Sequence, residues 1–154
     1  MTDDELVVQK VRAAIADRAL YLALLYRSFS KALPPEQVEK LAREAIYEFG
    51  QLKGKADNKP ITPRDWVENH ISCGGADLFE TEIVQTDEQC EQRMTFCPLM
   101  VGWKELGCSP QEMDLLCDIA MEVDRGRADF HGIPYEIGER LAKGDSFCRL
   151  ILKK

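Results

Sequence analysis

The chain has 154 residues, of which 45% are hydrophobic and 31% are charged, an ordinary composition for a globular protein. Its formal net charge is −7 and its basic residues are interleaved with acidic ones, which argues against a nucleic-acid partner. The acidic start, residues 1–5, and the lack of an apolar run long enough to cross a bilayer indicate no signal peptide and no membrane partner, so a cytoplasmic location is expected.

The six cysteines are expected to be reduced in that compartment. A disulfide framework is therefore not predicted, and the thiols need another explanation. Packing, ligand binding and catalysis all remain open for them at this point.

The first 55 residues predict a helical hairpin. Residues 5–31 contain no glycine or proline, which favours one long helix, and its apolar middle, residues 20–26, indicates burial or a homo-oligomer contact. Pro34 and Pro35 open a second helix with an apolar stripe that runs to Leu52. We expect the two helices to pack antiparallel, with a loop over residues 54–61 after them.

In the middle of the chain, the spacing of hydrophobic residues changes from a helical period to alternation. Thr62 and Pro63 start a short helix that runs to about residue 73. Residues 78–85 and 89–96 then alternate in polarity, which predicts a β-hairpin, and residues 98–107 form another short helix.

The last third repeats this order. Ser109 begins a capped helix that extends to about Arg125, and a loop is expected over residues 126–132. Residues 135–142 and 147–152 predict a second hairpin. The expected fold is a single α+β domain over 1–154: an antiparallel sheet of about four strands covered by helices on one face, with residues 1–55 as the helical hairpin and 62–154 carrying the cysteines.

Cys97 is the first candidate for chemistry, because it lies between a predicted strand and a predicted helix. As the N-cap residue, it would experience the positive end of the helix dipole and free amide groups, which lower a thiol pKa and create a reactive thiolate. The alternative is a small residue buried at the end of a strand.

Three more candidates lie downstream. Cys117 belongs to the apolar stripe of its helix, Asp118 follows it, and Cys148 shares a strand face with Leu150. Each cysteine could simply pack in the core, and the aspartate could be a general base or a solvated charge. We expect Cys97, Cys148 and Asp118 to line one pocket, with Cys117 at its wall. The sequence requires no cofactor; a soft metal such as zinc held by Cys97, Cys117 and Cys148 is an alternative that the spacing alone does not support.

A family resemblance rests on these same residues. The segments are Thr95-Phe96-Cys97-Pro98, Trp103-Lys104-Glu105-Leu106-Gly107, Leu116-Cys117-Asp118, and Gly144 followed by Cys148. In this order they resemble the L-2-amino-thiazoline-4-carboxylic acid hydrolase family. The resemblance implies hydrolytic opening of a cyclic, amidine-like ring, with the family's cysteines at Cys97, Cys117 and Cys148 and its acid at Asp118.

Three functional hypotheses follow. The first is a small hydrolase that cleaves a C–N bond in a cyclic or amide-like small molecule, with Cys97 as nucleophile, Asp118 moving protons, and Cys117 and Cys148 completing the site. The second is a non-catalytic thiol-rich domain that binds a small ligand or soft metal, or senses redox state. The third is a structural or partner-binding protein whose cysteines only pack.

Overall fold

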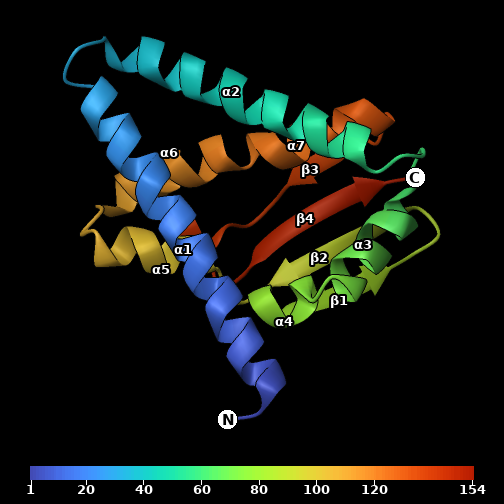
Figure 1. Cartoon of the computed structure of the whole chain (residues 1–154). Helices are drawn as coiled ribbons and strands as arrows, with labels where there is room; N and C mark the ends of the chain where they lie inside the picture. The colour runs from blue at the N-terminus through green and yellow to red at the C-terminus, as the bar shows by residue number, and fades with distance from the viewer.

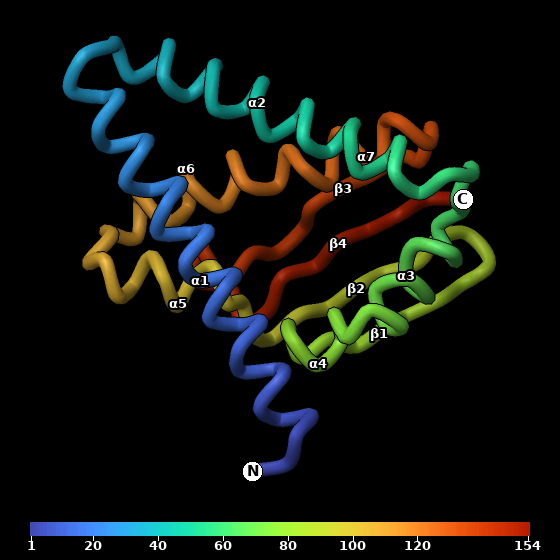
Figure 2. Tube along the Cα trace, viewed as in Figure 1, coloured from blue at the N-terminus to red at the C-terminus, as the bar shows by residue number.

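The computed structural model describes all residues, 1–154, as a helix-rich α+β fold (Figures 1 and 2). No helix combines the length and the apolar character needed to cross a membrane. The elements are α1 (Asp3–Phe29), α2 (Pro35–Ala56), α3 (Pro63–Ser72), α4 (Gly75–Phe79), β1 (Thr81–Gln85), β2 (Gln89–Met94), α5 (Pro98–Glu105), α6 (Pro110–Ala120), α7 (Glu122–His131), β3 (Tyr135–Ile137), the 3₁₀ turn η1 (Leu141–Lys143) and β4 (Cys148–Lys153).

One antiparallel sheet joins the two hairpins through β2 and β4. Its strand order is β1-β2-β4-β3, which confirms the expected four-stranded antiparallel sheet. In the β2–β4 register, Cys90 lies opposite Leu152 and Met94 lies opposite Cys148. The register therefore brings the segment after β2, which contains Cys97, next to the start of β4.

The helices cover one face of this sheet. Cys90 and Leu152 point to that face and pack with Val67 of α3 and Ala128 of α7 in a buried cluster. Strand alternation puts Glu91 on the other face, where it forms ion pairs with arginines. The sheet thus has one covered side and one polar side, as antiparallel sheets commonly do.

The two N-terminal helices diverge instead of packing along each other. A tight turn joins α1 and α2, but α1 packs mainly against α5 and α2 mainly against α7 (Figures 1 and 2). Glycines permit these close contacts: a Cβ on Gly102 would lie 2.4 Å from the carbonyl oxygen of Ala16, and one on Gly126 would lie 2.3 Å from that of Tyr47. The expected antiparallel packing within residues 1–55 is corrected accordingly.

Trp103 anchors α1 to the later helices. Its side chain is fully buried in a cluster with Ala19, Ala23, Leu116 and Cys117. Its indole N–H donates a 3.0 Å hydrogen bond to the carbonyl oxygen of Ala19. A buried indole needs such an acceptor, and here it ties α5 to the middle of α1.

Two predicted loops start later than expected, because residues 54–56 belong to α2 and residues 126–131 belong to α7. Gly126 lies within α7, and Gly54 lies within α2, which continues to Ala56. A Cβ on Gly54 would lie 2.6 Å from the ring of Phe130, and Gly126 contacts α2 equally closely. These glycines therefore serve close helix packing, and their reading as chain breakers is wrong.

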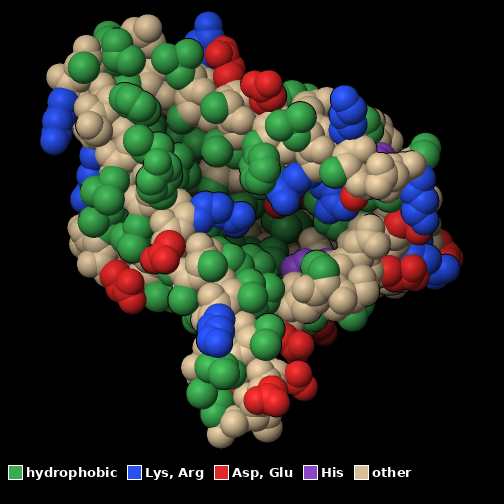
Figure 3. Space-filling model, viewed as in Figure 1, with side chains coloured by type: hydrophobic (Ala, Val, Ile, Leu, Met, Phe, Trp, Pro, Cys, Tyr) green, Lys and Arg blue, Asp and Glu red, His purple; other side chains and the backbone are tan.

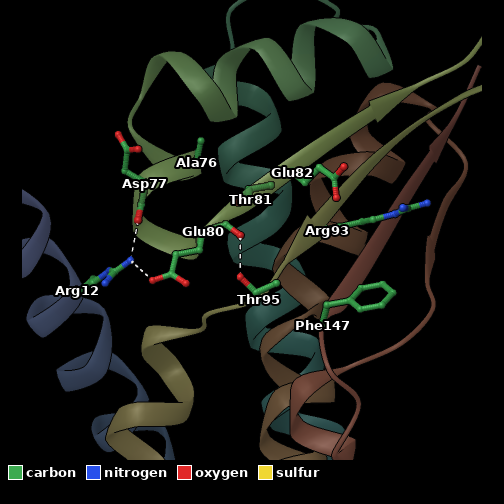
Figure 4. A pocket seen from close by; sticks show the side chains of 9 residues that line it. All are labelled: Arg12, Ala76, Asp77, Glu80, Thr81, Glu82, Arg93, Thr95 and Phe147. Carbon is green, nitrogen blue, oxygen red and sulfur yellow. Dashed lines mark hydrogen bonds and ion pairs between the residues drawn. The ribbon is translucent and has the colours of Figure 1, made fainter.

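The predicted strand over residues 78–85 starts later than expected. Leu78 and Phe79 end the short helix α4, and the strand begins at Thr81. Arg12 of α1 caps α4 by donating to the carbonyl oxygen of Leu78 at 3.0 Å and to that of Asp77 at 2.7 Å (Figure 4). These contacts satisfy carbonyl groups that end a helix, which explains the helical ending.

The second hairpin is also shorter than predicted. The strand β3 ends at Ile137, although Gly138 and Glu139 still form backbone hydrogen bonds with Arg149. Residues 141–143 then form a 3₁₀ turn. Asp145 accepts a 2.8 Å hydrogen bond from the backbone N–H of Arg140, which turns the chain away from the ladder. Residues 135–142, predicted as one strand, therefore leave the sheet before Arg140, and the Arg140 side chain lies against the helices.

Candidate functional site

A cavity of about 740 Å³ lies between the helices and the covered face of the sheet. Most of its lining is hydrophobic, with contributions from helices α1, α2, α3, α5, α6 and α7 and from strands β2, β3 and β4. Figure 3 shows a hollow on this side, with Lys, Arg and His side chains among hydrophobic ones. The volume falls in the range of small-molecule sites.

Three cysteines singled out from the sequence line this cavity: Cys97, Cys117 and Cys148. Cys97 is the N-cap residue of α5, Cys117 lies on α6, and Cys148 begins β4. A negative charge on Cys148 would raise the pKa of both other thiols, so the three groups lie within electrostatic reach of one another. No group of three or more His, Cys, Asp or Glu side chains is arranged to hold a metal ion.

The Cys97 thiol is protonated in the free protein. Burial raises its pKa to about 11, although the backbone N–H groups of Met100 and Leu99 at the start of α5 act in the opposite direction. The N-cap position is therefore as predicted, but the lowered pKa expected from it is corrected, because loss of solvent outweighs the helix terminus.

The other two thiols are protonated for the same reason. Burial raises the pKa of Cys117 to about 12, and it also raises that of Cys148. The Cys148 sulfur accepts a 3.3 Å hydrogen bond from the backbone N–H of Leu141. The cavity therefore presents thiols at neutral pH.

Asp118 does not line the cavity, contrary to the expectation from sequence. Its carboxylate binds Arg43 and Arg125, each at 2.7 Å, and lies 3.4 Å from Arg140. Burial alone would raise its pKa, but hydrogen bonds from Arg125 and Arg43 hold the pKa below its ordinary value. Asp118 is thus an ionised partner of the cavity-lining Arg140.

Asp124 is the carboxyl group that sequence reasoning missed. It lines the cavity from α7, accepts a 3.4 Å hydrogen bond from the Tyr135 hydroxyl, and burial raises its pKa. A signal was available, since Asp124 lies seven residues after Cys117, close to two helical turns. A carboxyl group with a raised pKa in a cavity is suited to proton transfer.

Basic side chains also reach the cavity wall. Arg127 binds Asp57 at 2.7 Å and lies over the ring of Trp66, and is therefore already partnered. Arg18 and Lys53 line the cavity without a carboxylate partner, although Lys53 lies over the ring of Phe49. These two cations are free to bind an anion.

Only one of the two histidines lines the cavity. His70 lines the cavity, and burial lowers its pKa, so that its imidazole is neutral. Its Nε2 lies 3.0 Å from the Thr81 hydroxyl. His131 lies outside the cavity lining and pairs with Asp57 at 2.8 Å.

A second hollow, of about 750 Å³, lies where α1, α4, β1 and β2 meet (Figure 4). Arg12 pairs there with Glu80 at 3.3 Å, and Thr95 bonds the carbonyl oxygen of Glu80. Only two of its nine lining residues are hydrophobic, and its central polar groups satisfy one another. It therefore offers less to a ligand than the thiol-lined cavity.

Comparison with known proteins supports one assignment. No curated protein sequence matches the chain closely enough to count as a relative. The family model described as L-2-amino-thiazoline-4-carboxylic acid hydrolase matches residues 12–152, which include every residue that lines the thiol cavity. The chain therefore belongs to the L-2-amino-thiazoline-4-carboxylic acid hydrolase family.

Proposed function

We propose that the protein is a small hydrolase that opens a ring C–N bond in a carboxylate-bearing cyclic amidine such as L-2-amino-thiazoline-4-carboxylate. The observation that carries this proposal is the convergence of Cys97, Cys117 and Cys148 on one cavity of about 740 Å³ in a chain of this family. A largely apolar cavity with a few polar groups suits a compact heterocycle.

The carboxylate of such a substrate has natural partners in the cavity. Arg18 and Lys53 line it, and neither forms an ion pair with a carboxylate. Charge-assisted hydrogen bonds from these groups would hold the substrate and fix which way the ring faces.

Because the pKa of Cys97 is raised, the group that attacks in the first step is a neutral thiol. Cys97, with a pKa of about 11, would add to the amidine as a thiol: its sulfur bonds to the amidine carbon, and its proton passes to the ring nitrogen. The bond between this carbon and the ring nitrogen then breaks, and the nitrogen leaves as an amine that takes a proton from Asp124. No thiolate has to exist before the substrate arrives.

Water completes the turnover. It adds to the same carbon and gives a proton back to the Asp124 carboxylate, and departure of Cys97 restores its thiol. The substrate has gained one water and carries a free amine and an S-carbamoyl group. Cys117 and Cys148 form the wall around the reacting carbon. Asp118 positions Arg140 together with Asp114, which binds Arg140 at 2.6 Å.

The protonated thiols also favour a second candidate function. A cavity in which Cys97, Cys117 and Cys148 are neutral can bind a small anionic ligand without attacking it. In this case the protein is a binding domain, and its ligand is released unchanged.

Mass spectrometry of the small molecule separates the two candidates. Purified protein is incubated with L-2-amino-thiazoline-4-carboxylate, and the hydrolase predicts a product heavier by one water that forms in proportion to protein concentration. Cys97→Ser should abolish it, and Cys108→Ser, which removes a thiol outside the cavity lining, should not. Binding without any product would reject the hydrolase and support the binding domain.

A further inference from the structure

One polar side chain in the cavity has no role in the chemistry described above. Gln92 lies in the middle of β2, opposite Ile83 of β1 and Leu150 of β4. It is 2% exposed and lines the thiol cavity, on the same strand face as Met94.

The amide nitrogen of Gln92 is buried and has no hydrogen-bond partner in the protein. Nearly all buried polar groups in folded proteins are hydrogen-bonded, because an unpaired buried donor destabilises the fold. An apolar side chain of the same shape would therefore suit the free protein better. The position makes physical sense if a molecule in the cavity accepts this hydrogen bond.

The surroundings define what that molecule offers at this point. The neighbouring parts of the lining, Met94, Cys97, Cys148 and Leu150, are apolar groups or thiols, whereas Arg18 and Lys53 lie on α1 and α2. An anionic group is better placed at the cations than at a neutral amide. Gln92 therefore faces an uncharged hydrogen-bonding edge of the ligand.

We propose that Gln92 is a specificity residue that recognises the amidine edge of the substrate, an inference that rests on the proposed function and extends it. A carboxamide carries a donor beside an acceptor, and a neutral amidine presents an acceptor beside a donor. The Nε2–H group donates to the ring nitrogen, and the Oε1 atom accepts from the exocyclic amino group. This pair of bonds presents the amidine carbon to the thiols.

Binding of two ligands tests this recognition. L-2-amino-thiazoline-4-carboxylate carries both the amidine and the carboxylate, whereas thiazolidine-4-carboxylate keeps the ring and the carboxylate but lacks the amidine. Dissociation constants are measured by calorimetry in the Cys97→Ser background, with Gln92 or with Gln92→Met, which conserves shape and removes the donor.

Gln92→Met is expected to weaken binding of the amidine ligand by about 10–100-fold and to change binding of thiazolidine-4-carboxylate by less than about 3-fold. The same substitution should raise the melting temperature of the unliganded protein by about 2–4 °C, because an unpaired donor is removed.

The inference would be overturned if Gln92→Met weakened binding of both ligands equally, or weakened binding of neither. It would also be overturned if neither ligand bound, or if Gln92→Met lowered the melting temperature. Turnover by the native protein is scored separately. Amidine preference without turnover rejects only the hydrolase, and turnover that Gln92→Met leaves unchanged rejects only the role of Gln92.

Discussion

Arg140 and Asp118 lie 3.4 Å apart, from Nη1 to Oδ1, and only Arg140 reaches the cavity wall. Because Arg43 and Arg125 bind the same carboxylate, Asp118→Asn leaves three guanidinium groups without their shared partner. We expect it to lower the free energy of unfolding by about 1–2 kcal/mol and to reduce kcat/KM by less than about 10-fold. Urea unfolding and steady-state kinetics measure both. Unchanged stability with activity abolished would instead make Asp118 catalytic.

Asp124→Asn, in contrast to Asp118→Asn, is expected to reduce activity strongly. The raised pKa of Asp124 and its place in the cavity fit a group that gives and takes protons, which an amide cannot replace. Its kcat should fall by about 10²–10⁴-fold, while substrate binding remains within a few fold. A loss confined to KM would show that Asp124 only contacts the substrate.

Much of the fold follows from local sequence signals. Strand alternation and capping residues predict both hairpins and the N-cap position of Cys97, because these signals act over a few residues. The β2–β4 register, which places Met94 opposite Cys148, joins segments far apart in the chain and cannot be derived from either strand alone.

The predictions that were wrong depend on tertiary packing, which the local sequence does not contain. Gly126 is helical because it contacts α2, a partner more than 70 residues earlier that the local pattern does not contain. The pKa of Cys97 depends on two terms: a local helix terminus, which sequence predicts, and burial, which only packing determines. Asp124 was missed because its place in the cavity also depends on how α7 packs.

The thiols should differ in their rates of alkylation. Cys73 is exposed, whereas Cys97 is buried with a pKa raised to about 11, so iodoacetamide should label Cys73 first at neutral pH. The thiolate fraction of Cys97 increases as pH approaches that value, so its labelling rate should increase steadily through pH 7–10. Peptide mass spectrometry resolves the two sites. Fast labelling of Cys97 at pH 7 would mean that the pKa is lowered after all.

The close contact between α2 and α7 should be sensitive to one methyl group. A Cβ at Gly126 would lie 2.3 Å from the Tyr47 carbonyl oxygen, so Gly126→Ala forces the helices apart and should cost about 1–3 kcal/mol of unfolding free energy. Gly138→Ala is the matched control, because its Cβ would meet nothing closer than 3.6 Å. Chemical denaturation compares the two; equal stability of both variants would contradict the packing described for α2 and α7.

The proposed mechanism depends most on Cys97 as the group that attacks the amidine carbon. The most direct measurement is kcat/KM for L-2-amino-thiazoline-4-carboxylate in Cys97→Ser compared with Cys108→Ser, which removes a buried thiol that does not line the cavity. We expect kcat/KM to fall by about 100-fold or more in Cys97→Ser and by less than about 3-fold in Cys108→Ser, with both proteins folded by circular dichroism. Equal activities in the two variants would contradict it.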